Sequence, residues 1–317
     1  MKTTPVLPED LGKSVIAVPP LARNADFSLN EAANRALIAH LEAGGVRSLM
    51  YGGNANFYNI GLSEYARVLE FLESAVGPDT WLLPSFGPDY GKLMDQAAIL
   101  RGSRFPTAMA LPMTFPASQA GIAIGLRKAA EAMAKPIVVY IKSDNYIDPA
   151  DLGRLAKDGL VTSIKYAVVR DDPLQDDYLR KLLDHVDPRL MVSGIGERPA
   201  IVHFRDFGLT SFTSGSVCVG PRGSMAILAA LKRGDWDMAA KLREAYMPLE
   251  DLRDGISPIR VLHEAVRLGG VADTGPMLPL LTGLDEAACG KIAPVAKALK
   301  AWDAALETAQ LSGRAAE

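Results

Sequence analysis

A lysine and a tyrosine each close a short apolar run of the chain, and together they could carry out carbonyl chemistry. Lys165 ends the run 160–164, Leu-Val-Thr-Ser-Ile, and Tyr140 ends the run 136–139, Pro-Ile-Val-Val. If the runs are neighbouring parallel strands, both side chains lie at one edge of a sheet. An apolar pocket lowers the pKa of a lysine and makes it nucleophilic, and a tyrosine hydroxyl can relay protons. We therefore predict a Schiff-base site with Lys165 as nucleophile and Tyr140 as proton carrier.

Lys142 lies two residues beyond Tyr140 and has two interpretations. A second ammonium group near Lys165 would lower the pKa of that lysine or bind a substrate carboxylate. A lysine in a loop can equally point into solvent. Both interpretations stay open from the sequence.

The elements that must position these residues alternate along the chain. Short β-branched runs are separated by segments of helical periodicity, such as Asn30 to Glu42 and Ser63 to Ala75. Eight strand candidates begin near Ser14, Arg47, Thr80, Pro106, Pro136, Leu160, Arg189 and Leu209. Eight βα units predict a (β/α)8 TIM barrel. An open nucleotide-binding sheet is disfavoured, because residues 19–23 read Pro-Pro-Leu-Ala-Arg where Gly-x-Gly-x-x-Gly would stand.

After residue 234 the sequence pattern becomes helical only. Helices are expected over Trp236 to Asp254, Ser257 to Leu268 and Asp285 to Thr308. Glycines and the Pro276 to Gly283 stretch separate them. The predicted organisation is therefore a barrel over residues 1–232 and a C-terminal appendage of three helices over residues 233–317.

The composition excludes several classes of partner. The chain is 49% hydrophobic and 22% charged with a net charge of -3, which argues against disorder and against binding nucleic acid. No apolar run approaches the ~20 residues that span a bilayer, and residues 1–10 lack a signal-peptide core, so no membrane association and a cytoplasmic location are expected. The four histidines have no zinc-ligand spacing, and two distant cysteines form no metal cluster. Neither a metal nor another cofactor is expected.

In a (β/α)8 barrel the chemistry lies at the C-terminal ends of the strands, so the residues there are the candidates for the site. They are residues 52–56 (Gly-Gly-Asn-Ala-Asn), 112–114 (Pro-Met-Thr), Tyr140, Lys142, Asn145, Lys165, Gly194, Glu197 and 213–216 (Thr-Ser-Gly-Ser).

Several of these motifs make the chain resemble the dihydrodipicolinate synthase and N-acetylneuraminate lyase family of class I aldolases. The family has a proline in its first strand, a Gly-Thr-Thr-Gly-Glu loop after the second, a tyrosine at the end of the fifth and an Ile-Lys lysine at the end of the sixth. This chain has Val18-Pro19, the 52–56 loop, Tyr140 and Ile164-Lys165 at those places. The resemblance covers about residues 14–302 and implies a homotetramer.

The chain departs from the family pattern at three places. Asn54 and Ala55 stand where the family has two threonines that bind the pyruvate carboxylate. Met113-Thr114 aligns with the relay tyrosine, and Asn145 with the arginine that holds a second carboxylate in the synthases. Backbone N–H groups of the glycine-rich turn could still hold a carboxylate. The substrate-binding residues predicted on this basis are Gly53, Asn54, Ala55, Thr114, Asn145 and Ser214.

These residues predict a carbon–carbon lyase that joins Lys165 to pyruvate or another small 2-oxo acid. It is expected to make or break the adjacent C–C bond, or to dehydrate a 2-keto-3-deoxy sugar acid. The sequence does not indicate the second substrate. One alternative is a family member that has lost turnover and only binds a keto acid or a partner protein. A metal-dependent barrel lyase is disfavoured, because the strand ends offer Glu197 but no carboxylate–histidine set.

Overall fold

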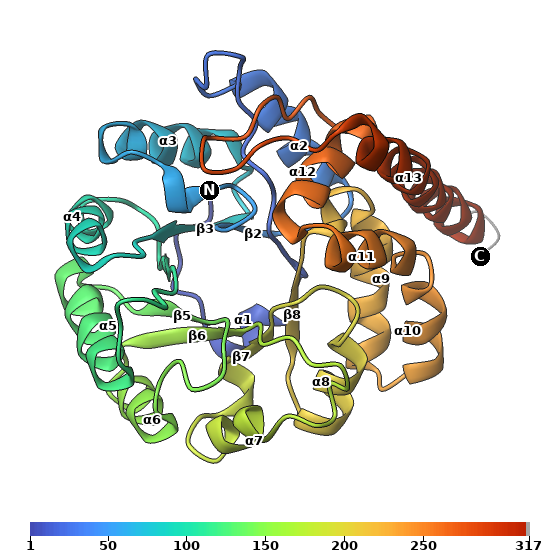
Figure 1. Ribbon diagram of the computed structural model, residues 1–317. Helices are drawn as coiled ribbons and strands as arrows, with labels where there is room; N and C mark the ends of the chain where they lie inside the picture. The colour runs from blue at the N-terminus through green and yellow to red at the C-terminus, as the bar shows by residue number, and fades with distance from the viewer. Residues whose placement is uncertain (315–317) are drawn as a thin grey trace.

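Eight parallel strands form a closed barrel in which each strand pairs with the next along the chain and β8 pairs with β1 (Figure 1). The computed structural model describes the backbone of residues 1–314 and the side chains of residues 1–306. The strands are β1 (Ile16–Ala17), β2 (Ser48–Tyr51), β3 (Trp81–Phe86), β4 (Met109–Ala110), β5 (Ile137–Ile141), β6 (Val161–Tyr166), β7 (Met191–Ser193) and β8 (Ser211–Ser214). The predicted (β/α)8 barrel is confirmed.

Helices surround the barrel as an outer ring. They are α2 (Glu31–Ala43), α3 (Leu62–Ala75), α4 (Tyr90–Arg101), α5 (Gln119–Met133), α6 (Pro149–Lys157), α7 (Asp177–Leu183), α8 (Ala200–Phe207) and α9 (Pro221–Lys232), with 3-10 turns η1 (Phe57–Asn59), η2 (Pro188–Leu190) and η3 (Ser216–Cys218). Asn30, Asp89 and Ser118 each accept a hydrogen bond from the backbone N–H three residues later, which fixes the starts of α2, α4 and α5.

The N-terminal segment covers the end of the barrel opposite the candidate site. It contains α1 (Pro8–Leu11), and two of its backbone carbonyls accept hydrogen bonds from strand side chains. Thr162 Oγ1 donates to the Val6 carbonyl and Ser211 Oγ to the Leu11 carbonyl, both over 2.6 Å. The side chains that line the C-terminal ends of the strands therefore lie at the other, open mouth.

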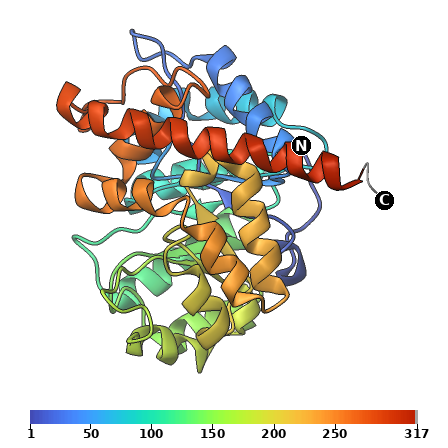
Figure 2. The same cartoon turned by 90° about the vertical axis from the view of Figure 1, so that its right-hand side faces the viewer.

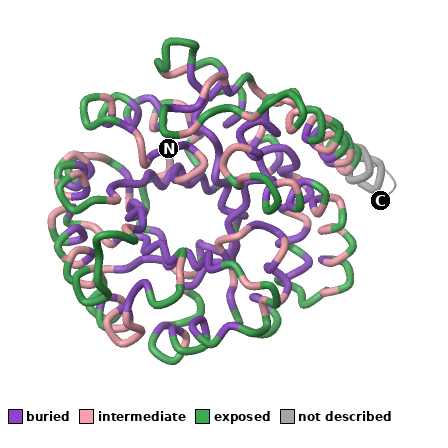
Figure 3. Tube along the Cα trace, in the orientation of Figure 1, coloured by how far each residue is buried: buried purple, intermediate pink, exposed green. Residues whose placement is uncertain are grey.

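Burial follows the layers of the barrel. The strands form a ring of buried residues, and exposed residues lie on the outer sides of the helices (Figure 3). Successive side chains on a strand point to opposite faces. Along β6, Tyr166 points outward and its hydroxyl donates to Asp176, so Lys165 points into the barrel.

The C-terminal region differs from the prediction in one respect. It has four helices within the described residues: α10 (Trp236–Arg243), α11 (Met247–Gly255), α12 (Pro258–Leu268) and α13 (Glu286–Arg314). The single helix expected over residues 236–254 is wrong, because Pro248 lacks the N–H that would bond to Glu244 and its ring would clash there. The chain turns at residues 244–246 and restarts as α11.

The C-terminal helices lie against one side of the barrel. The long helix α13 runs along the outside of the molecule, where it contacts α9, α11 and α12 (Figure 2). Helices α11 and α12 extend over the C-terminal mouth of the barrel (Figure 1). The domain boundary at residues 232 and 233 stays a prediction.

Candidate active site

Lys165 and Tyr140 face each other inside the barrel mouth. They are register partners on β6 and β5, and Lys165 Nζ lies 4.6 Å from the centroid of the Tyr140 ring. Only 6% of Lys165 and 9% of Tyr140 is exposed. No carboxylate in the described part of the chain pairs with this Nζ. The geometry therefore gives a buried amine beside a phenol, without the salt bridge that usually accompanies a buried lysine.

A small cavity of about 140 Å³ opens above this pair. The barrel strands, the loops that follow them and helices α11 and α12 all contribute to its walls. The lining residues are Val18, Gly53, Asn54, Tyr58, Tyr140, Lys142, Lys165, Ala167, Val169, Gly194, Ile195, Gly196, Thr213, Gly215, Arg253, Asp254, Pro258, Ile259 and Leu262. The volume lies below the roughly 300–1,000 Å³ of pockets for drug-sized ligands. The cavity suits a small substrate.

Burial dominates the electrostatics of Lys165. Burial, together with the smaller effects of the Lys142 and Arg253 charges, lowers the pKa of the amine to about 7. Near neutral pH a large fraction of the amine is therefore unprotonated and nucleophilic. Burial raises the pKa of the Tyr140 hydroxyl to about 12, against a smaller opposing effect of Arg253, so this group holds its proton at neutral pH.

The loop after β2 contributes backbone donors to the cavity. Asn54 Nδ2 donates to the Val18 carbonyl over 2.9 Å, which holds the side chain against β1. The first turn of η1 uses the N–H groups of Asn56 and Phe57, whereas those of Gly53 and Asn54 donate to no acceptor within residues 1–314. Free N–H groups at a helical turn are suited to binding an anion.

The structure gathers only some of the residues predicted from the sequence. Gly53 and Asn54 line the cavity with Lys165 and Tyr140. Ala55 is buried behind the loop, beside Leu278 and His263.

Three other candidates lie outside the cavity. Thr114 is exposed in the loop after β4. Asn145 is exposed at a φ of 55°, and its carbonyl accepts a hydrogen bond from Gln119. The Ser214 hydroxyl points outward and accepts from the Val217 N–H.

Two residues outside the predicted set of catalytic and substrate-binding residues line the cavity instead. Thr213 precedes Ser214 and points inward, and its buried Oγ1 has no partner among the described residues. Arg253 reaches the cavity from α11, where it is 5% exposed. Thr213 belongs to the candidate group 213–216, but the alternation of strand side chains alone does not show whether Thr213 or Ser214 points inward. No local signal indicates Arg253, because its position depends on the path of α11 over the barrel.

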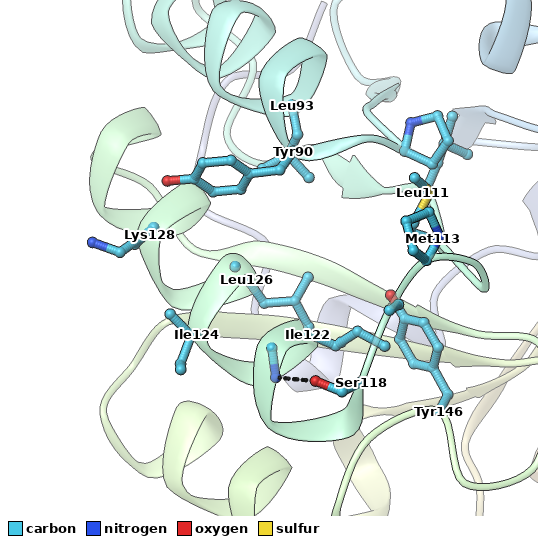
Figure 4. A pocket seen from close by; sticks show the side chains of 15 residues that line it. Tyr90, Leu93, Leu111, Met113, Ser118, Ile122, Ile124, Leu126, Lys128 and Tyr146 are labelled. Carbon is cyan, nitrogen blue, oxygen red and sulfur yellow. Dashed lines mark hydrogen bonds between the residues drawn. The ribbon is translucent and has the colours of Figure 1, made fainter.

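A larger apolar groove of about 690 Å³ lies elsewhere, between α4, α5 and the loop after β4 (Figure 4). Tyr90 and Leu93 of α4 face Ile122 and Leu126 of α5 across it. Its lining carries one charged side chain, Lys128, and no nucleophile with a general base. The groove is therefore a poorer candidate for catalysis than the smaller cavity at Lys165.

The residues that the structure describes lack two further kinds of feature. No helix in that part is long and apolar enough to span a bilayer. The same residues contain no cluster of three or more histidine, cysteine or acidic side chains with the geometry of a metal site.

The lowered pKa of Lys165 predicts how imine formation depends on pH. The rate of trapping by cyanoborohydride with pyruvate should rise as pH increases through about 7, because deprotonation makes the amine nucleophilic. Lys142→Met removes a cation that lowers this pKa, so its profile should shift to higher pH. Mass spectrometry of the adduct across pH measures both. A wild-type midpoint near the ordinary lysine value of 10.5 would contradict the assigned environment.

Comparison with known proteins places this chain in a family. The sequence model of the Dihydrodipicolinate synthetase family matches residues 13–298. A protein of Bradyrhizobium diazoefficiens, described as "Probable 5-dehydro-4-deoxyglucarate dehydratase", is 24% identical over 324 residues, which cover 98% of this chain and 99% of that protein. The names of the family and of this relative denote lyases in the general sense.

Solved structures share the fold at low identity. Dihydrodipicolinate synthase from Bacillus clausii superposes with a TM-score of 0.80 at 20% identity, over 93% of this chain and 99% of that chain. YagE, a prophage protein of E. coli K12 solved in complex with pyruvate, gives a TM-score of 0.78 at 20% identity, over 90% and 98% of the two chains. These likenesses show the fold alone, whereas the family model spans nearly the whole sequence. The chain belongs to the dihydrodipicolinate synthetase family.

Proposed function

We propose that this protein is a Schiff-base-forming lyase that acts on pyruvate or another small 2-oxo acid. The observation that carries the proposal is Lys165, a buried amine with no carboxylate partner among the described residues. Its pKa is lowered to about 7, and its Nζ lies over the Tyr140 ring. Catalytic lysines that form imines have this desolvated environment. The N–H groups of Gly53 and Asn54, which have no acceptor in the described part of the chain, support a binding place there for the substrate carboxylate.

The proposed reaction begins when the Lys165 amine adds to the C2 carbonyl. Loss of water leaves a protonated imine, which accepts an electron pair from the neighbouring carbon. That pair comes either from a broken C3–C4 bond, as in an aldolase, or from a C3 proton removed before a C4 hydroxyl leaves, as in a dehydratase. Tyr140 is assigned the proton transfers, because its ring lies beside the amine and its hydroxyl keeps its proton at neutral pH.

The relatives support both versions of this chemistry. The Bradyrhizobium protein carries the name of a sugar-acid dehydratase, and the E. coli protein was solved with pyruvate. The cavity of about 140 Å³ is small enough to favour short acids. We therefore propose a small-molecule 2-oxo acid as the substrate and leave aldol cleavage and dehydration as two outcomes of the same imine.

Borohydride reduction in the presence of pyruvate tests the proposal. The expected product is one reduced pyruvyl group on Lys165, identified by peptide mass spectrometry, because an imine is reduced whereas a free amine is not. A folded protein that gains no adduct across a panel of 2-oxo acids would contradict the Schiff-base function. It would leave the alternative of a protein that only binds a keto acid or a partner.

We also propose a homotetramer, in which a second copy covers the apolar groove between α4 and α5. Ile124 in the lining of the groove and Phe115 in the adjoining loop are 58% and 85% exposed, and contiguous exposed apolar side chains mark protein interfaces. A symmetric contact brings the same surface of two copies together. The sequence of one chain corresponds to 33.9 kDa.

Light scattering at micromolar concentration should give the mass of four chains. Ile124→Asp places a charge in the contact surface and should lower that mass, whereas Met238→Asp, a change on α10 away from the groove, should not. A wild-type particle of 33.9 kDa would refute the tetramer.

A further inference from the structure

We propose that Arg253 binds a second carboxylate of the substrate, so that the enzyme selects 2-oxo acids with an anionic group at the end distant from the carbonyl. This inference rests on the proposed imine at Lys165. It assigns a recognition role to a residue of α11, outside the strands and loops of the barrel.

Arg253 belongs to the same cavity as the reacting groups. The side chain is 6% exposed and lines the cavity of Lys165. Its charge lowers the pKa of both Lys165 and Tyr140, which requires that the guanidinium lie within electrostatic range of both. Arg253 donates a hydrogen bond to the Ile195 carbonyl in the loop after β7. In the closed sheet, β1 and β8 lie between β7 and β2. An anion at Arg253 would thus lie on a different wall from a carboxylate at the β2 loop.

The hydrogen bonds of Arg253 fix the guanidinium but do not use all of its donors. Nε and Nη2 donate to Asp254 over 3.0 and 2.8 Å, and Nη1 donates to the Ile195 carbonyl over 2.8 Å. A guanidinium has five N–H donors, so Nη1 and Nη2 each keep one. Glu250 Oε2 lies 2.9 Å from Nη1, but this oxygen accepts no hydrogen bond from the described residues. One N–H of Nη1 and one of Nη2 therefore have no hydrogen-bond acceptor among the described residues, and a carboxylate could accept from them.

The charges around the cavity favour an anion. Lys142 and Arg253 are cationic, and Asp254 is the one carboxylate in the lining. Glu250 and Glu197 lie behind the wall, fully buried, and burial raises the pKa of both, Glu250 to about 7. Burial therefore weakens the negative charge of Glu250 at neutral pH, so this acid does not fully cancel the charge of Arg253. A substrate with two carboxylates matches this distribution.

A pair of ligands of equal length tests the inference on the wild-type protein. 2-Oxoadipate and 2-oxohexanoate differ only in a terminal carboxylate against a methyl group. Cyanoborohydride trapping at Lys165 should reach half-saturation at a concentration about ten-fold or more lower for 2-oxoadipate, because a charge-assisted bidentate contact is strong. Added salt should reduce this preference.

Variants separate Arg253 from the general charge of the site. Arg253→Gln should remove the preference while 2-oxohexanoate is still trapped, and Arg253→Lys should retain part of it. Arg198→Gln is the matched control, since Arg198 pairs with Asp251 and Asp254 but does not line the cavity. It should keep the preference.

Two results would overturn the inference while leaving the imine intact. One is equal trapping of both ligands by the wild-type protein, and the other is a folded Arg253→Gln protein that keeps the preference. If Arg253→Gln does not fold, the inference is tested by the preference of the wild-type protein for 2-oxoadipate and by the partial loss of that preference in Arg253→Lys. If the wild-type protein forms no adduct with either ligand, the result contradicts the proposed Schiff-base function and therefore also this inference.

Discussion

Replacing Lys165 by alanine should abolish imine trapping with pyruvate and reduce turnover roughly 10⁴-fold or more, as the loss of a covalent nucleophile does in other enzymes. The physical reason is that the buried amine is the atom that bonds to the substrate carbonyl, and alanine offers no electron pair. Exchange of the C3 protons of pyruvate with deuterated water, followed by NMR, measures the reaction without a second substrate. The Lys165→Ala rate should equal that of buffer alone.

A second lysine of lowered pKa provides the matched control for this experiment. Lys135 is also partly buried, and desolvation lowers its pKa. It donates to the carbonyls of Leu100 and Ser103, away from the cavity. Lys135→Ala should keep the adduct and the exchange rate. An adduct that persists in Lys165→Ala, or one that disappears in Lys135→Ala, would place the nucleophile elsewhere.

The barrel and the central pair of the site could be predicted because both leave local signals. Eight β-branched runs separated by helical periodicity specify the number of βα units. Strand ends in a barrel converge at one mouth, so a lysine and a tyrosine that close adjacent runs must be neighbours there. The register of Tyr140 with Lys165 agrees with that expectation. Their chemical roles stay predictions until the adduct is measured.

Thr213 and Ser214 show where local signals end. Both close the last strand run, and a shift of one residue exchanges the inward and outward faces of a strand. The structure places Thr213 in the cavity and turns the Ser214 hydroxyl toward the Val217 N–H. The sequence does not show which alternate residues of β8 point toward the barrel axis, because every residue of this strand is buried on one side or the other.

Arg253, Thr114 and Asn145 depend on non-local structure. The break at Pro248 and the restart as α11 bring Arg253 over the barrel mouth, and nothing in residues 247–255 alone specifies that direction. The predictions for Thr114 and Asn145 rest on alignment to a family whose loops differ here in composition, and both residues are exposed in this structure. Loops tolerate such changes more than strands do, so loop positions transfer poorly between distant relatives.

Tyr140→Phe should slow exchange of the pyruvate C3 protons by roughly 10²-fold or more while the imine at Lys165 can still be trapped. In the wild-type protein, Lys165 Nζ lies 4.6 Å from the centroid of the Tyr140 ring. Phenylalanine keeps this ring but removes the hydroxyl that carries the proton. A proton carrier acts in the transition state, so rate should fall more than binding. Tyr90→Phe, which removes an exposed hydroxyl on α4, is the matched control and should exchange like wild type. Exchange at the wild-type rate in Tyr140→Phe would show that this tyrosine only packs against the lysine, and that another group lining the cavity moves the proton.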